Sequence, residues 1–143
     1  MMTLPHHPFG TEITATDIVA QMQSAKGWED RYRNVIQLGK KLPALPDEYK
    51  QDNVTVSGCE SQVWLVHAKQ NEVFHFAADS DARIVRGLIT LVLAVYEGKT
   101  ADEIAAFDID SYFADLGLID HLSPSRGNGL KAIVEQIKRL ATA

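Results

Sequence analysis

The sequence predicts an α+β fold in which helices pack on one face of a three-stranded antiparallel sheet. Segments with a helical spacing of apolar residues stand before and after a single run of strand-like segments, an order typical of this class. The 143 residues, 45% of them apolar, are enough to build one hydrophobic core. We therefore expect a single domain over residues 14–143, preceded by a leader.

The leader and the first helices follow from simple patterns. Residues 1–13 should form a flexible leader, because prolines and a glycine interrupt them and their apolar residues follow no period. A short helix is expected at 14–24 and a second, after Gly27, at about 28–41. The apolar stripe of the second helix should face the core, and it consists of Trp28, Tyr32, Val35, Ile36 and Leu42.

Three strands are expected at 54–57, 62–68 and 73–78, which are rich in β-branched and aromatic residues. The four residues 69–72, between the second and third of these segments, suit a hairpin turn. The strands should therefore pair antiparallel in one sheet.

The segment after the strands should be the central buried helix of the domain. Asp79, Ser80 and Asp81 offer capping side chains and acidic charge at its start, and Gly98 is suited to end it. Its apolar residues cover much of the helix circumference: Ile84, Val85, Leu88, Ile89, Val92, Leu93 and Tyr96. Such a helix must be enclosed on several sides.

Shorter helices and one long helix should complete the domain. Thr100 and Glu103 have the spacing of a capping box, in which each side chain bonds the backbone of the other. Helical turns are expected at 109–116. Ser123 places a capping hydroxyl before Pro124 at the start of the last helix, whose periodic apolar residues should pack on the core.

Charge and hydropathy exclude several classes of function. The 19 acidic and 14 basic residues give a net charge of −5 with no long basic run, so nucleic acid is not an expected partner. The longest apolar run, 88–95, is far shorter than the roughly 20 residues that cross a bilayer, so no membrane partner is expected. The N-terminus lacks the pattern of a secretory signal. We expect a soluble cytoplasmic protein with a reduced thiol.

Cys59 is the only cysteine, which excludes an internal disulfide and any site built from several thiolates of one chain. It follows Gly58 in a polar stretch between two predicted strands, where a tight exposed turn is expected. A buried structural cysteine would instead lie within an apolar pattern. We therefore expect a thiol that another protein can reach.

The histidines offer little support for catalysis or metal binding. A nucleophilic cysteine needs a base nearby, and the nearest histidines in the sequence, His67 and His75, alternate with apolar neighbours as exposed strand residues do. His6 and His7 are two adjacent ligands without a third, which make a poor metal site. A cysteine hydrolase and a metal centre are therefore unsupported.

Arg126 is a candidate anion-binding residue. The stretch 123–129 brings its fixed positive charge, free backbone donors and two glycines to the start of one helix. An ordinary capped helix with a solvated arginine would explain the stretch equally well. Asp79 and Asp81 are likewise explained as ordinary carboxylates at a helix start unless something else recruits them.

Five stretches match a known family pattern in the same order and across nearly the whole chain. They are WEDRY at 28–32, LGKKL at 38–42, SGCESQVW at 57–64, DSDARIVRGL at 79–88 and LSPSRGNGL at 122–130. On these stretches the chain resembles the SufE/CsdE family of cysteine-desulfurase sulfur acceptors. The leader segment 7–11 is more similar to the CsdE branch, whereas 60–64 and 79–82 are at least as similar to SufE.

The resemblance implies a fold and a mechanism. A pyridoxal-phosphate cysteine desulfurase, SufS-like or CsdA-like, would pass persulfide sulfur to Cys59 and be stimulated by doing so. The acceptor would then deliver the sulfur to a downstream acceptor or scaffold, towards iron–sulfur cluster assembly or another sulfur-transfer pathway. The cofactor would belong to the desulfurase, and none is expected in this chain. The fold would be similar to that of iron–sulfur scaffold proteins.

The resemblance also assigns two further residues. Arg126 matches an arginine of the family motif and is the candidate that stabilises the thiolate or persulfide, and Asp81 matches an acidic position that would adjust the cysteine loop. We expect a sulfur-transfer accessory protein rather than a stand-alone enzyme, as a monomer or a homodimer. Two alternatives stay open: a regulatory module that stimulates a desulfurase by contact alone, and an iron–sulfur scaffold-like protein, which would need thiolates from more than one subunit.

Overall fold

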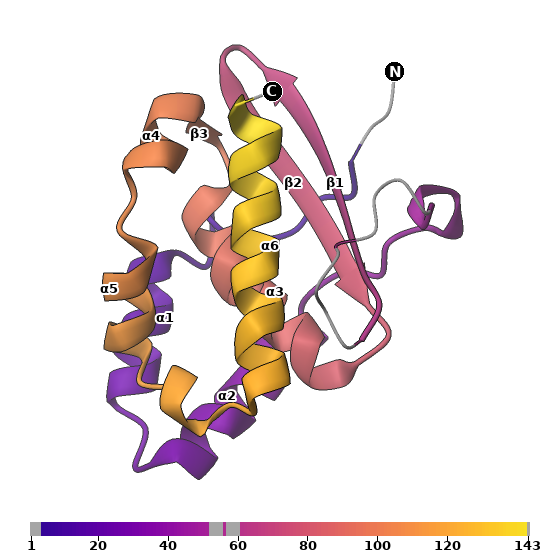
Figure 1. The fold of residues 1–143 in the computed structure, drawn as a ribbon. Coiled ribbons are helices and arrows are strands. Elements are labelled where there is room, and N and C mark those ends of the chain that lie inside the picture. Colours follow the sequence, from indigo (N-terminus) through magenta and orange to yellow (C-terminus); the bar gives the residue numbers. More distant parts are fainter. Residues whose placement is uncertain (1–3, 52–55, 57–60, 143) are drawn as a thin grey trace.

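The computed structural model describes residues 4–51, 56 and 61–142, and these form a single α+β domain (Figure 1). The elements, in chain order, are α1 (Ala15–Gln23), α2 (Trp28–Lys40), η1 (Asp47–Tyr49), β1 (Val63–Gln70), β2 (Val73–Ser80), α3 (Arg83–Tyr96), β3 (Lys99–Thr100), α4 (Ala101–Ala106), α5 (Ile109–Leu116), η3 (Ile119–His121) and α6 (Pro124–Thr142). The predicted fold class and the order of its long elements are confirmed.

The sheet has the order β1-β2-β3, and both pairs are antiparallel. The hairpin between β1 and β2 is tighter than predicted, because both strands extend to a two-residue turn. Asn71 and Glu72 form this turn with φ values of 53° and 68°, a left-handed geometry that matches the twist of a hairpin.

The third strand differs from the predicted one. The segment predicted at 54–57 lies outside the described residues except for Val56, which is not in a strand and whose N–H donates to the Val63 carbonyl at 2.9 Å. The sheet is completed by β3, where Lys99 pairs with Phe74. A two-residue strand has no alternating pattern that a sequence reading could detect.

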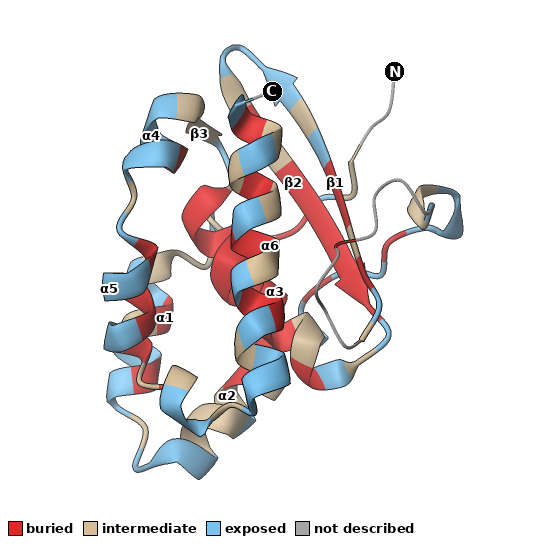
Figure 2. Cartoon of the chain, viewed as in Figure 1, coloured by how far each residue is buried: buried red, intermediate tan, exposed pale blue. Residues whose placement is uncertain are grey.

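The helix α3 is the centre of the core, as predicted. Eleven of its 14 residues are buried, and it packs against α2, β2 and α6 (Figure 2). Gly87 on α3 and Gly39 on α2 allow these two helices to approach closely. A Cβ atom on Gly87 would lie 2.2 Å from the Val35 carbonyl oxygen, and one on Gly39 would lie 2.8 Å from the Gly87 nitrogen. Neither position has room for a side chain.

The predicted helix starts are largely confirmed. Thr14 and Asp17 form a capping box at the start of α1, and Thr100 and Glu103 form another at α4. The predicted piece at 109–116 is α5, and α6 begins at Pro124 after Ser123. One prediction here is wrong: α3 begins after Ala82 without a side-chain cap, so the acidic residues before it have other partners.

Trp28 was expected in the core and is instead 46% exposed. It is the first residue of α2, so its ring lies beyond the helix turns that contact α3. The ring stacks on His121, with centroids 5.7 Å apart, and meets Tyr32 edge to face. The rest of the stripe is buried or half-buried.

The leader has no regular helix or strand in its described part, residues 4–13, but it is anchored by two side chains. Phe9 is fully buried in the main core, and His7 is buried as well. Leu4 packs on the opposite face of the sheet, beside Leu45, Val66 and Ala77. A segment without periodicity can therefore contribute to the core through single residues.

The contact between α2 and α3 leads to a test by Gly87→Ala. The added methyl group would have to displace the Val35 backbone, so we expect a loss of about 2–3 kcal/mol in the free energy of unfolding, measured by urea denaturation. The matched control is Gly127→Ala in α6, where an added Cβ meets nothing within 4 Å and alanine should slightly stabilise the helix. Equal stability of the two variants would contradict this account of the packing.

Candidate functional site

Cys59 lies outside the described residues, but the chain on its C-terminal side is firmly held. The N–H of Gln62 donates to Asp81 Oδ1 at 3.1 Å, and the Gln62 carbonyl accepts from Ser80 Oγ at 2.6 Å and from the Asp81 N–H at 3.4 Å. Three residues after Cys59, the chain is thus fixed to the end of β2. Asp81, which was singled out in the sequence, lies at this junction.

A small pocket of about 60 Å³ lies between Ser61, α3 and the first turns of α6. Its lining combines three polar residues, Ser61, Ser125 and Arg126, with Val85, Leu88, Gly129, Leu130 and Ile133. Arg126 is exposed, and its backbone N–H donates to Ser123 Oγ at 3.3 Å. The structure therefore brings Arg126 to the same pocket as Ser61, two residues from Cys59.

Asp79 has a different environment from the helix start that the sequence indicated. It is 2% exposed, and its carboxylate accepts from the Leu45 N–H at 2.9 Å and from the Ser80 N–H at 2.8 Å. Arg86 donates to the same carboxylate and to the Leu42 carbonyl, and Lys50 Nζ lies 3.6 Å from it. Asp79 thus joins β2, α3 and the segment that follows α2.

Sequence reasoning missed this role because the partners of Asp79 are up to 34 residues away in the chain. A signal was present in the sequence. A carboxylate at the end of a buried strand needs a cationic partner, and Arg86 follows in α3, from where its side chain reaches the Asp79 carboxylate. Lys50 also lies over the Trp64 ring, 4.9 Å from its centroid. The described chain on the N-terminal side of Cys59 is therefore anchored as well.

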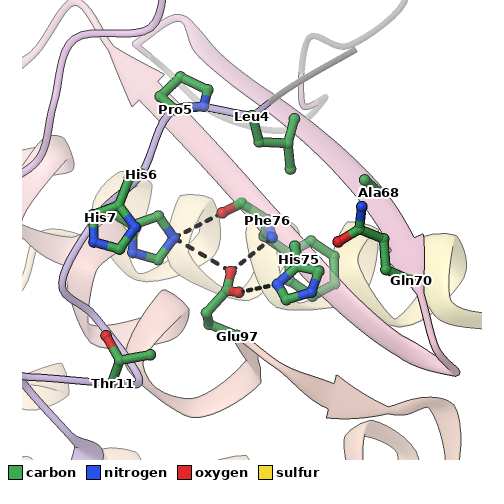
Figure 3. A pocket seen from close by; sticks show the side chains of 10 residues that line it. All are labelled: Leu4, Pro5, His6, His7, Thr11, Ala68, Gln70, His75, Phe76 and Glu97. Carbon is green, nitrogen blue, oxygen red and sulfur yellow. Dashed lines mark hydrogen bonds and ion pairs between the residues drawn. The ribbon is translucent and has the colours of Figure 1, made fainter. Parts of the chain in front are cut away.

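A second polar cluster surrounds Glu97, which follows α3, on a cavity of about 350 Å³ (Figure 3). Glu97 Oε1 accepts from the Phe76 N–H at 2.8 Å, and Oε2 lies 2.5 Å from His75 Nδ1. His7 Nε2 lies 3.3 Å from Glu97 Oε1 and 2.8 Å from the Phe76 carbonyl oxygen. Glu97 therefore holds the two histidines that face it in Figure 3, His7 and His75.

The bonds of His7 define the roles of its two ring nitrogens. Nε2 donates to the Phe76 carbonyl, and Nδ1 accepts from the Phe9 N–H at 3.2 Å. Burial raises the pKa of Glu97, but the hydrogen bonds from His7, from the Phe76 N–H and from His75 outweigh it, so the pKa lies below its ordinary value of 4.5.

This cluster is distinct from the surroundings of Cys59. His75 pairs with Ala68, five residues along β1 from Val63, which corresponds to about 17 Å of strand. His67 is exposed on β1, with its ring 6.5 Å from that of Phe74. Neither histidine is positioned to act as a base at Ser61, and the described residues contain no group of three or more side chains arranged to hold a metal ion. The Glu97 cluster holds the leader against the sheet.

Comparison with known proteins gives a family and a fold. Residues 16–141 match the family model described as SufE, Fe–S metabolism associated domain. The sulfur acceptor protein CsdE of Escherichia coli K12 is 47% identical over 132 residues, which cover 92% of this chain and 90% of that protein. An uncharacterized SufE-like protein of Rhizobium etli is 51% identical over 118 residues, 80% of each chain.

The fold also occurs in a solved structure. The solution structure of a hypothetical protein from Thermus thermophilus superposes with a TM-score of 0.72 at 15% identity and covers 91% of this chain and 94% of its own. At this identity the likeness concerns the fold alone. Among the helices of the described residues, none combines the length and the apolar character that crossing a membrane requires.

The low pKa of Glu97 makes stability depend on pH. A carboxylate stabilised by folding contributes fully above its ordinary pKa of 4.5, and the contribution is lost as the pH falls through the lower folded value. We expect Glu97→Gln to lower the melting temperature at pH 7 and to flatten its fall below pH 4.5, measured by circular dichroism. Some slope should persist, because backbone hydrogen bonds also lower the pKa of Asp17 and of Glu103.

Glu12→Gln is the matched control, since Glu12 is an exposed carboxylate of the leader without a part in the cluster. Its acid transition should follow that of the wild type. If the acid transition of Glu97→Gln were also unchanged, the Glu97 cluster would not contribute to the pH dependence of stability.

Proposed function

This chain belongs to the SufE family of Fe–S metabolism associated domains, and we propose on that premise that it accepts persulfide sulfur from a cysteine desulfurase on Cys59. In the proposed cycle it stimulates that enzyme and passes the sulfur on, towards iron–sulfur cluster assembly or another sulfur-transfer pathway. The pyridoxal phosphate would belong to the desulfurase.

The observation that carries this proposal is the identity of 47% to a sulfur acceptor protein over 92% of the chain. A likeness of this length preserves the whole domain rather than one motif. Cys59 is the only thiol that could take the sulfur, since the sequence has no other cysteine.

The transfer step is an exchange between a thiolate and a persulfide. The Cys59 thiolate attacks the outer sulfur of the donor's persulfide, a new S–S bond forms at Cys59, and the S–S bond of the donor breaks. The donor cysteine leaves as a thiolate, so no external oxidant or reductant is needed. Two properties of the acceptor favour this step: a large thiolate fraction and a well-placed chain.

Arg126 is the proposed source of the first property. Ser61, which follows Cys59 by two residues in the sequence, shares its pocket with Arg126. A guanidinium close to the thiol would favour the thiolate over the thiol, whose unperturbed pKa of about 8.5 leaves it mostly protonated at neutral pH.

Asp81 is proposed as a positioning residue that acts through Gln62. The hydrogen bonds of Gln62 to Asp81 and Ser80 fix the point where the chain enters β1, three residues after Cys59. The carboxylate is exposed and accepts a backbone N–H, so it supports the chain without entering the pocket.

Intact mass spectrometry tests the acceptor role directly. After incubation with a cysteine desulfurase and cysteine, we expect the wild type to gain about 32 Da, the mass of one sulfur atom, and to lose it on reduction. Cys59→Ser should gain nothing. Persistent stimulation of the desulfurase by Cys59→Ser would instead favour a regulatory module that acts by contact.

Alkylation of the single thiol tests Arg126. In Arg126→Ala the pKa of Cys59 should rise, so iodoacetamide should react at least about threefold more slowly at pH 7 and at the wild-type rate above pH 10. Arg126→Lys should restore part of the rate at pH 7, because it retains the charge. Arg139→Ala, which removes an exposed arginine at the far end of α6, is the matched control. An equal loss in this control would contradict a local role of Arg126.

A further inference from the structure

An open groove of about 570 Å³ runs between α1 and α5, which pack against each other. Its floor is apolar and includes Ala15, Val19, Phe107 and Tyr112, of which all but Tyr112 are only partly buried. Polar side chains of the two helices, among them Asp108 and Asp115, form its sides. This combination of an apolar floor and polar sides is typical of a surface that receives a helix of another protein.

The groove is rigid at its floor and at one end. The Phe107 ring meets Tyr96 and Tyr112 edge to face, at 6.0 and 5.8 Å between centroids, and the Tyr112 hydroxyl donates to the Leu91 carbonyl at 2.9 Å. At one end, Arg31 donates to the carbonyls of Met22, in the last turn of α1, and of Gly117, just after α5. The spacing of the two helices is thus fixed before any partner binds, which lowers the cost of binding.

Charge indicates which partner the groove would receive. Residues 1–25 and 100–125, which include α1, α4 and α5, hold eight of the 19 acidic side chains and none of the 14 lysines and arginines. All eight are exposed: Glu12, Asp17, Asp102, Glu103, Asp108, Asp110, Asp115 and Asp120. The rest of the chain holds eleven acidic and fourteen basic side chains, a formal charge of +3. The surface around the groove is therefore complementary to a basic segment.

The groove also lies away from the surroundings of Cys59. In Figure 1, α1 and α5 are at the left edge, the strands β1 and β2 are at the right, and α3 and α6 stand between them. The residues that line the groove and those that line the pocket of Ser61 and Arg126 have no member in common. Both surfaces could be occupied at the same time.

We propose that the groove between α1 and α5 is the docking site for an amphipathic helix of a partner protein, with apolar side chains on the groove floor and lysines or arginines beside Asp108 and Asp115. This inference goes beyond sulfur acceptance and stands on the described residues alone. It provides a second interaction surface, which a partner can use while a sulfur donor is at Cys59.

The probe for this site is a fluorescein-labelled Leu/Lys amphipathic helical peptide of about 18 residues, five helical turns. Its affinity for the full chain is measured by fluorescence anisotropy, with a Leu/Glu peptide of the same pattern as the reference. We expect the Leu/Lys peptide alone to bind, and its affinity to weaken as salt is added. Amide shifts in NMR spectra of the ¹⁵N-labelled protein should concentrate on α1, Phe107 and α5.

Asp115→Lys tests the groove without disturbing the fold, because Asp115 is exposed in the last turn of α5, where a cation is favourable. Asp108 is unsuitable, since its carboxylate caps α5 through the Ser111 N–H. We expect Asp115→Lys to weaken peptide binding about tenfold, equivalent to about 1.4 kcal/mol, and the control Glu48→Lys, an equal charge change at an exposed site on η1, to weaken it less than twofold.

The proposal would be overturned by equal effects of the two charge changes or by peptide-induced shifts spread over the whole surface. Self-association of the wild type that Asp115→Lys abolishes would also overturn it, since the occupant would then be a second copy of this chain. Sulfur transfer to Cys59 in Asp115→Lys, measured by intact mass, should match the wild type. Failure of peptide binding with intact sulfur transfer would therefore remove the docking site and leave the acceptor role in place.

Discussion

The close contact between α2 and α3 is the constraint on which the rest of the fold depends. Because α3 is buried along nearly its whole length, each neighbouring element must supply a face that fits it. At Gly39 and Gly87 the two helix backbones meet with no side chain between them. This contact determines the distance between α2 and α3. Because the sheet and α6 pack on α3, it also determines their positions. The pocket beside Ser61 is formed by α3 and α6.

Polar groups at the end of β2 connect this core to the surroundings of Cys59. Asp79 points to the segment after α2 and binds it through Leu45 and Lys50, whereas Ser80 and Asp81 bind Gln62 on the other side of the cysteine. Both described ends of the chain around Cys59 are thus attached to three consecutive residues at the end of one strand. For the sulfur transfer proposed at Cys59, anchors on both sides of the cysteine would favour a reproducible position of the thiol.

Local patterns were sufficient to predict much of this structure. The capping box at Thr100, the start of α6 at Pro124 and the buried circumference of α3 all depend on residues within a few positions of one another. What the sequence did not reveal depends on distant partners. Asp79 finds its donors across 34 residues, and His7 reaches Phe76 across 69. The short strand β3 exists only because β2 pairs with it. Of the candidate site, the sequence pattern identified Arg126 and the family resemblance added Asp81. Arg126 shares a pocket with Ser61, and Asp81 accepts from the Gln62 N–H.

The contacts of Arg31 have a consequence for polarity. A single guanidinium reaches the C-terminal carbonyls of both α1 and α5, so these two helices run in the same direction. Their backbone dipoles then add instead of cancelling, and each carbonyl-rich end carries a partial negative charge of about −0.5. Arg31 supplies one full positive charge where the two ends meet, which offsets their sum. The guanidinium thus removes the repulsion that two parallel helices would otherwise have between their C-terminal ends.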